Sequence, residues 1–161
     1  MLDATAIMLP ARAPSIVPAT DADLAAIGCR RIELSERLGL WCLVDADDYD
    51  WLIANRWNAG YWANTPHKRY AKRNVGAARS TVYLHREVMI RADPRTEVFQ
   101  STHVVDHVNG QPLDDRKANL RWATEAENRA NRIPWRDVPS LDQIVAQLLR
   151  DAAAAPDALP Y

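Results

Sequence analysis

Cysteine is scarce in this chain, with two in 161 residues. That number is too small for the disulfide framework of a small secreted domain, although it leaves one disulfide open. Cys29 and Cys42 do not form the C-x-x-C pair that is typical of structural zinc sites. We therefore expect no structural zinc.

Long hydrophobic runs are also missing. No apolar segment approaches the roughly 20 residues that a transmembrane helix needs. Residues 1–17 lack the charged start and clean apolar core of a secretory signal peptide. The sequence therefore predicts a protein without a membrane partner, located in the cytoplasm of a bacterium or of a phage-infected host cell.

The chain also lacks a large net charge of either sign, because it contains 20 Lys and Arg and 21 Asp and Glu. The charges are nevertheless unevenly distributed. Residues 51–135 contain 14 basic against 8 acidic residues, whereas the rest of the chain contains 6 against 13. A basic centre between acidic ends is expected of a protein that faces nucleic-acid phosphates, although a solvated basic face would look similar.

The most informative stretch is residues 103–132, which read HVVDHVNGQPLDDRKANLRWATEAENRANR. The β-branched residues of 103–107 predict one strand, and residues 120–123 predict a second. Thr124 and Glu127 fit a capping box, in which each side chain accepts a hydrogen bond from the backbone amide of the other residue. This motif is typical of a helix start. The pattern therefore predicts a hairpin followed by a helix.

Four polar side chains in this stretch are suited to chemistry. Asp106 and Asn128 offer the oxygen ligands that Mg²⁺ prefers, and a helix packed on the hairpin would bring them together. A neutral His107 beside such an ion could deprotonate a water, with the side chain or backbone of Asn119 holding the imidazole in the required tautomer. Each residue alone also has an ordinary explanation, such as a turn cap or a core histidine. Their combination at these spacings favours a site.

Together these residues resemble the ββα-metal finger of HNH (His-Me finger) endonucleases, close to the phage and homing type. The motifs are VDHVNG, ANLRWAT and EAEN, and the upstream YLHR resembles the strand that precedes the finger. The resemblance implies that His107 and Asn119 are catalytic, with His107 as the general base. It also implies that Asp106 and Asn128 bind Mg²⁺, for which Mn²⁺ is expected to substitute. The last ligand is Asn here, rather than the His that gives the family its name.

Other elements are predicted from patterning and cap residues. A helix over residues 45–55 has an acidic first turn that complements the helix dipole. Ser140 is the expected N-cap of a C-terminal helix, whose apolar face either packs on the core or makes a homodimer or other protein contact. Residues 93–101 are expected to form a loop. The remaining predictions are strands at 31–34, 40–44, 60–64, 69–74 and 81–89 and a short helix at 87–91.

The predicted fold class is α+β, with a small antiparallel β-sheet region followed by a ββα-metal finger (β-hairpin plus helix) and a C-terminal helix. Residues 1–28 are expected to form a mobile N-terminal arm with a short helix at 21–27. A β-rich DNA-contacting region follows at 29–100. Residues 101–135 form the finger, a name kept below, and residues 136–161 form the C-terminal helix and tail.

Basic residues on the predicted loops of the sheet and near the predicted metal site are candidates for phosphate contacts. They are Lys68, Arg69, Lys72, Arg73, Arg86, Lys117 and Arg121. The sequence thus predicts a metal-dependent DNA endonuclease that makes nicks or double-strand cuts. Two alternatives stay open: a catalytically silent DNA-binding module on the same scaffold, and an HNH ribonuclease or toxin domain.

Overall fold

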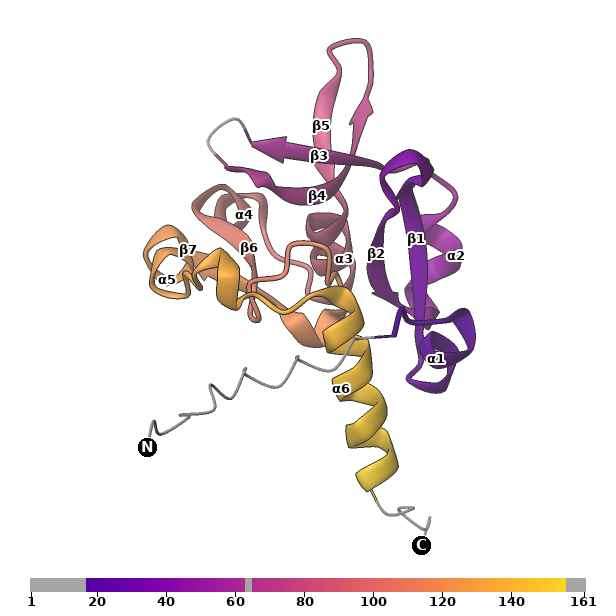
Figure 1. Cartoon of the computed structure of the whole chain (residues 1–161). Helices are drawn as coiled ribbons and strands as arrows, with labels where there is room; N and C mark the ends of the chain where they lie inside the picture. Colours follow the sequence, from indigo (N-terminus) through magenta and orange to yellow (C-terminus); the bar gives the residue numbers. More distant parts are fainter. Residues whose placement is uncertain (1–16, 63–64, 156–161) are drawn as a thin grey trace, which may run out of the picture.

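The computed structural model describes residues 17–62 and 65–155, and within them the strands form three small antiparallel sheets (Figure 1). These sheets are β1–β2, β3–β4–β5 and β6–β7. Their strands are Cys29–Ser35 (β1), Leu40–Asp45 (β2), Asn58–Trp62 (β3), Thr65–Val75 (β4), Ser80–Tyr83 (β5), His103–His107 (β6) and Leu120–Thr124 (β7). Helices lie between and around these sheets, so the predicted α+β class is confirmed.

The helices of the described residues are short, except for the last one. They are α1 (Asp21–Ala26), α2 (Tyr49–Leu52), α3 (Leu84–Ala92), α4 (Glu97–Thr102), α5 (Glu125–Ala130) and α6 (Leu141–Ala154). Figure 1 shows the β3–β4–β5 sheet at one end, with the β1–β2 hairpin on one side and the β6–β7 hairpin with α5 on the other. No helix in this described part of the chain combines the length and apolar character that a membrane span requires.

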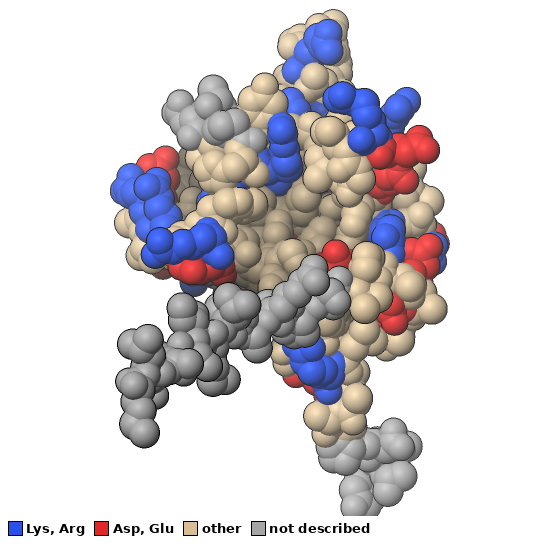
Figure 2. All heavy atoms as spheres, viewed as in Figure 1, with Lys and Arg blue, Asp and Glu red and all other residues tan. Residues whose placement is uncertain are grey.

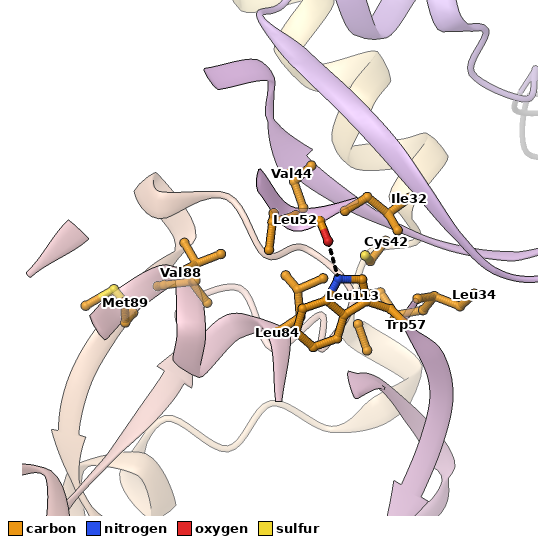
Figure 3. Packing of buried hydrophobic residues seen from close by; sticks show 12 residues of the cluster. Ile32, Leu34, Cys42, Val44, Leu52, Trp57, Leu84, Val88, Met89 and Leu113 are labelled. Atoms are coloured by element: carbon orange, nitrogen blue, oxygen red, sulfur yellow. Dashed lines mark hydrogen bonds between the residues drawn. The ribbon is translucent and has the colours of Figure 1, made fainter. Parts of the chain in front are cut away.

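The main core joins the β1–β2 hairpin to the finger. Leu52, Leu84 and Val88 are almost completely buried there, and Leu120 of the finger packs in the same cluster (Figure 3). The indole Nε1 of Trp57 donates a hydrogen bond of 2.9 Å to the carbonyl of Leu52, so its polar atom is satisfied inside the core. Burial of each leucine contributes about 1.5–3 kcal/mol, which fixes the finger against the sheet region.

A second core cluster lies where α1, β2 and α6 meet. Leu24 of α1 packs with Leu43 of β2 and with Ile144 and Val145 of α6. The predicted N-cap of α6 is confirmed, because Ser140 Oγ accepts a hydrogen bond from the amide of Gln143. The apolar face of α6 therefore packs on the core, and a homodimer through this helix stays a prediction.

The predicted arm divides into two parts. The helix predicted at residues 21–27 is confirmed as α1, with Thr20 as its N-cap. The amide of Ala19 donates a hydrogen bond of 2.8 Å to Oδ1 of Asp142, so packing crosses the boundary predicted at residue 28. Residues 1–16 of the predicted mobile arm lie outside the described residues.

The strand predicted at residues 81–89 is wrong beyond Tyr83. The chain enters α3 at Leu84, so the short helix predicted at 87–91 begins three residues earlier. Leu84 and Val88 stand one helical turn apart and are both buried, so core packing overrides the β-propensity of this segment. His85 therefore lies in the first turn of a helix rather than at the end of a strand.

The loop predicted at residues 93–101 is also wrong, because α4 occupies most of it. Thr96 is the N-cap of this helix, and its Oγ1 accepts a hydrogen bond of 3.2 Å from the amide of Phe99. The cap satisfies one of the first amides of the helix, which is the physical reason the helix begins there.

The helix predicted at residues 45–55 is shorter than expected. Only a 3₁₀ turn at Ala46–Asp48 and α2 form in this segment. None of the acidic side chains caps α2. Asp48 Oδ1 instead accepts a hydrogen bond of 2.9 Å from the indole of Trp51, and its Oδ2 lies 2.9 Å from Nζ of Lys117.

The basic residues expected on loops lie on a strand. β4 runs without interruption from Thr65 to Val75, so Lys68, Arg69 and Lys72 are strand residues. The disulfide left open by the sequence does not form, because Cys29 and Cys42 are buried free thiols.

Candidate active site

The finger forms the hairpin and helix that its sequence predicts. β6 pairs antiparallel with β7, which places Asp106 opposite Arg121. The predicted capping box is present, since Oγ1 of Thr124 accepts from the amide of Glu127 at 3.3 Å and Oε2 of Glu127 accepts from the amide of Thr124 at 2.7 Å. The helix start is therefore fixed directly at the end of β7.

A pocket of about 110 Å³ lies where β4, the end of β6 and the end of α5 meet. Its wall includes four predicted site residues, namely the candidate phosphate contact Lys68 and the finger residues Asp106, His107 and Asn128. The other lining residues are Tyr70, Val105, Gly110, Pro112, Asn131, Arg132 and Ile133. The structure thus brings together the predicted base and both predicted metal ligands.

Asp106 is held at the pocket by one of its two carboxylate oxygens. Oδ2 accepts hydrogen bonds from Nε and Nη2 of Arg121 at 3.1 and 2.9 Å, and from Nδ2 of Asn131 at 3.0 Å. Among the described residues, every hydrogen bond to this carboxylate ends on Oδ2. Oδ1 therefore has no hydrogen bond within the described part of the chain.

Two asparagines of the finger reach this pocket. Asn128 in α5 lines its wall, whereas Asn131 is the C-cap residue of that helix. The Asn131 amide donates to Asp106 and to the carbonyl of His107, the latter at 3.2 Å. Asn131 therefore fastens the end of β6 through its amide nitrogen.

His107 is buried, and its Nε2 lies 2.9 Å from Oδ1 of Asp115. The ring of His85 meets it edge to face, with the two centroids 4.9 Å apart. Burial lowers the pKa of His107 to about 4. The ring is therefore neutral at pH 7, which is the form that can accept a proton.

Asp115 and His85 complete this buried cluster, and sequence reasoning missed both roles. Burial raises the pKa of Asp115 to about 7 and lowers the pKa of His85 to about 3. Oδ2 of Asp115 and Nδ1 of His85 have no hydrogen-bond partner among the described residues. The sequence signal for His85 was its place in the YLHR motif. The signal for Asp115 was the Asp114-Asp115 doublet inside a loop, which looks like ordinary solvated charge.

Asn119 does not contact the ring of His107 through a hydrogen bond in the described structure. Its Oδ1 accepts from the amide of Asn109 at 3.0 Å, and its Nδ2 donates to the carbonyl of Asp114 at 2.8 Å. The side chain of Asn119 therefore does not hold the ring of His107, and Asp115 lies at Nε2 of that ring instead. Asn119 closes the loop between β6 and β7. The catalytic role of Asn119 stays a prediction.

Four of the predicted phosphate contacts are placed where a nucleic acid could reach them. Lys68 lines the pocket, and Arg121 contacts Asp106 while its side chain stays 46% exposed. Arg69 lies over the exposed ring of Tyr61, with 4.7 Å from its guanidinium carbon to the ring centroid. The side chain of Lys72 crosses Gly60 on the neighbouring strand β3, whose missing side chain leaves room for it.

The other three predicted contacts form ion pairs or hydrogen bonds with other residues of the chain. Nη2 of Arg73 lies 3.3 Å from Oε2 of Glu87, and Nη2 of Arg86 donates to the carbonyl of Gln100 at 2.9 Å. Lys117 was expected near the predicted metal ligands. It pairs instead with Asp47 and Asp48 at 2.8 and 2.9 Å and does not line the pocket. Although burial acts in the opposite direction, hydrogen bonds with these two carboxylates raise the pKa of Lys117.

Comparison with known proteins gives one match. The family model described as HNH endonuclease matches residues 82–130, which include Asp106, His107, Asn119 and Asn128. No curated protein and no solved structure matches the chain. The match thus supports the HNH resemblance of the motifs over residues 82–130, whereas the phage and homing type stays a prediction.

Proposed function

We propose that this HNH-type nuclease hydrolyses the phosphodiester bonds of DNA, with His107 as general base and one Mg²⁺ on Asp106 and Asn128. Mn²⁺ would substitute for Mg²⁺. The observation that carries the proposal is the pocket lined by these three residues. Of the family types, the phage and homing type fits the motifs best.

The side chains of the pocket fit a hard divalent ion. A carboxylate and a side-chain amide supply oxygen atoms, and Mg²⁺ commonly takes one or two carboxylates while keeping several waters. Oδ1 of Asp106 faces no partner among the described residues, which supports a ligand role. When bound, the ion would supply charge stabilisation at the phosphate oxygens and at the leaving oxygen.

The protein residues would perform the remaining steps. The neutral imidazole of His107 would take a proton from a water as that water attacks the phosphorus. Lys68 and Arg132 line the same pocket and carry the positive charge that a phosphate requires. Arg121 holds the Asp106 carboxylate in place.

Figure 2 supports DNA as the substrate, because Lys and Arg side chains gather over the β3–β4–β5 sheet and over the α5 side of the face. A hollow lies between these two groups, and Asp and Glu side chains lie mainly beside β1, β2 and α2. A nucleic-acid backbone crossing this face would meet basic residues on both sides of the hollow.

The test is cleavage of supercoiled plasmid DNA with and without Mg²⁺, with a single-stranded RNA of matched length as second substrate. Nicked circles or linear DNA that appear only with the metal would support the proposal and would distinguish nicking from double-strand cutting. DNA binding without cleavage in Mg²⁺ or Mn²⁺ would instead indicate a silent binding module. Faster cleavage of the RNA would indicate a ribonuclease or toxin domain.

Measurements of metal affinity should distinguish the roles of Asn128 and Asn131. We expect Asp106→Ala and Asn128→Ala each to weaken Mn²⁺ binding by more than the roughly 10–100-fold that is typical for losing an outer-shell partner, because each removes an oxygen ligand. Asn131→Ala should weaken it less, because that side chain fastens the end of β6 as a donor. Isothermal titration with Mn²⁺ measures all three. A larger loss for Asn131→Ala than for Asn128→Ala would shift the last ligand one helical turn along the chain.

The salt dependence of DNA binding should locate the bound backbone. In a His107→Ala background, the double variant Lys68→Ala/Arg69→Ala should lower the slope of log affinity against log salt by up to about two units. Cognate and random duplexes should be affected alike, because phosphate contacts carry no sequence information directly.

The matched control for this experiment is Lys117→Ala. Lys117 is a lysine whose charge is already paired with Asp47 and Asp48, so its loss should leave the slope unchanged. A slope that falls for Lys117→Ala, and stays constant for the double variant, would move the DNA to the β1–β2 side of the molecule.

A further inference from the structure

Backbone hydrogen bonds to β2 hold Asp115 next to His107, the proposed base. Its amide donates a hydrogen bond of 2.9 Å to the carbonyl of Leu43, and the amide of Leu43 donates to the carbonyl of Leu113 at 2.8 Å. The loop between β6 and β7 is thus joined to β2 like an added strand, and Leu43 and Asp114 form a parallel bridge. The backbone of Asp115 is therefore fixed by a central strand of the core.

The side chain of Asp115 is directed at the ring of His107. Oδ1 lies 2.9 Å from Nε2, and the carboxyl is 1% exposed. Cys42 on β2 is fully buried and interacts electrostatically with the same carboxyl. Burial disfavours the charged form of this carboxyl and raises its pKa to about 7.

We infer that Asp115 is a positioning residue for the proposed reaction, one that accepts a hydrogen bond from Nε2 of His107 and leaves Nδ1 as the basic nitrogen. The inference rests on the proposed function of His107. A neutral imidazole carries one proton, and the partner of one nitrogen decides which nitrogen keeps a lone pair. With Nε2 tied to a buried carboxyl, only Nδ1 can take the proton of a water.

His85 has a supporting part in this arrangement. Its ring packs edge to face on His107 and stacks on Tyr83, with centroids 4.9 and 5.5 Å away. Burial of this ring lowers its pKa to about 3, so it forms an uncharged wall beside the base. Its Nδ1 has no partner among the described residues, and one of its ring nitrogens lies within 4.8 Å of a carboxyl oxygen of Asp115.

The direct test is the tautomer of His107 in the whole protein. Long-range proton–nitrogen NMR correlation on protein with ¹⁵N-labelled histidine identifies the ring nitrogen that carries the proton, and His107→Ala assigns the signal. We expect the Nε2–H form at a pH of about 8.5, above the pKa of about 7 of Asp115, where the carboxylate is ionised and can accept, in the absence of metal and DNA. An Nδ1–H form in the wild-type protein would overturn the inference.

Two substitutions of similar size separate positioning from packing. Asp115→Leu removes the acceptor, so we expect mixed tautomers and a fall in kcat of about 10²–10³ with little change in KM. Asp115→Asn keeps a carbonyl oxygen for Nε2, while its amide nitrogen can donate to the unpartnered nitrogen of His85. It should therefore keep the Nε2–H form and a kcat within about tenfold of the wild type.

Each outcome bears on the inference separately from the proposed function. If Asp115→Leu keeps the wild-type tautomer and kcat, Asp115 does not position the base. If Asp115→Leu does not fold in a thermal unfolding scan, the wild-type tautomer and the Asp115→Asn kinetics decide. If His107→Ala still cleaves, the proposed function fails, while the tautomer measurement still reads whether Asp115 directs the ring.

The same cluster offers two histidines and a carboxyl to a transition metal, which is the competing explanation. His85→Phe discriminates between the two, because it keeps an aromatic wall and removes a ligand. The positioning role predicts an unchanged tautomer in this variant and no stoichiometric zinc in the purified wild-type protein by elemental analysis. Zinc that His85→Phe and Asp115→Leu both lose would overturn the inference.

Discussion

Replacing His107 by alanine is expected to lower the rate of DNA cleavage by about 10²–10⁴-fold, because general-base removal typically has an effect of that size. The ring lines the pocket beside Asp106 and is neutral at pH 7, so it meets the two requirements of a base, which are reach and protonation state. The measurement is single-turnover cleavage of a plasmid at saturating Mg²⁺. DNA affinity should change little, because His107 carries no charge at that pH.

The matched control is His103→Ala. His103 lies on the same strand, but its ring stacks on Phe99 with centroids 3.8 Å apart. Its loss should leave the cleavage rate within a few-fold of the wild type, about the scatter expected of a surface substitution. Equal losses in the two variants would point to damage of β6 rather than to removal of a base. Wild-type cleavage by His107→Ala would remove His107 from the mechanism.

The finger was predictable because its signals are local. The capping box of Thr124 and Glu127 and the β-branched run that ends at His107 act within a few residues of one another. Such signals fix the hairpin and the helix start, and with them the position of Asp106 near Asn128. The family match over residues 82–130 covers the same segment.

The partners of the site were not predictable, because they come from distant parts of the chain. Asp115 reaches His107 only because its loop pairs with Leu43 of β2. Lys117 is withdrawn from the candidate phosphate contacts by Asp47, a residue 70 positions away. Charge counting along the sequence treats such a lysine as available, whereas only the fold shows that it is paired.

The helix α3 failed prediction for a related reason. Residues 81–89 contain enough β-branched and aromatic residues to resemble a strand, but the core of the β1–β2 hairpin offers a place for Leu84 and Val88 on one helical face. Burial of two such side chains is worth about 3–6 kcal/mol, which exceeds the difference of about 1 kcal/mol in local propensity. The helical turn is also what carries His85 into the cluster around His107.

The second large effect is expected on stability, from Asp114→Ala. The side chain of Asp114 is fully buried and accepts from Nε and Nη2 of Arg116, both at 2.7 Å, and from Nδ2 of Asn109 at 2.8 Å. Removing the carboxylate leaves the guanidinium of Arg116, which is 13% exposed, without its counter-charge. Breaking a buried ion pair in this way costs about 3–5 kcal/mol. We therefore expect a loss of about that size in the free energy of unfolding by urea.

The exposed pair of Asp137 and Arg136 is the control for this prediction. Their side chains lie 3.7 Å apart and are 56% and 85% exposed, so Asp137→Ala should change the free energy of unfolding by less than about 1 kcal/mol. The double variant Asp114→Ala/Arg116→Ala should lose less than the sum of its two single variants, because the unpaired charge is gone. Strictly additive losses would show that Asp114 acts through its bond to Asn109. A loss no larger than that of Asp137→Ala would show that the loop between β6 and β7 does not depend on this carboxylate at all.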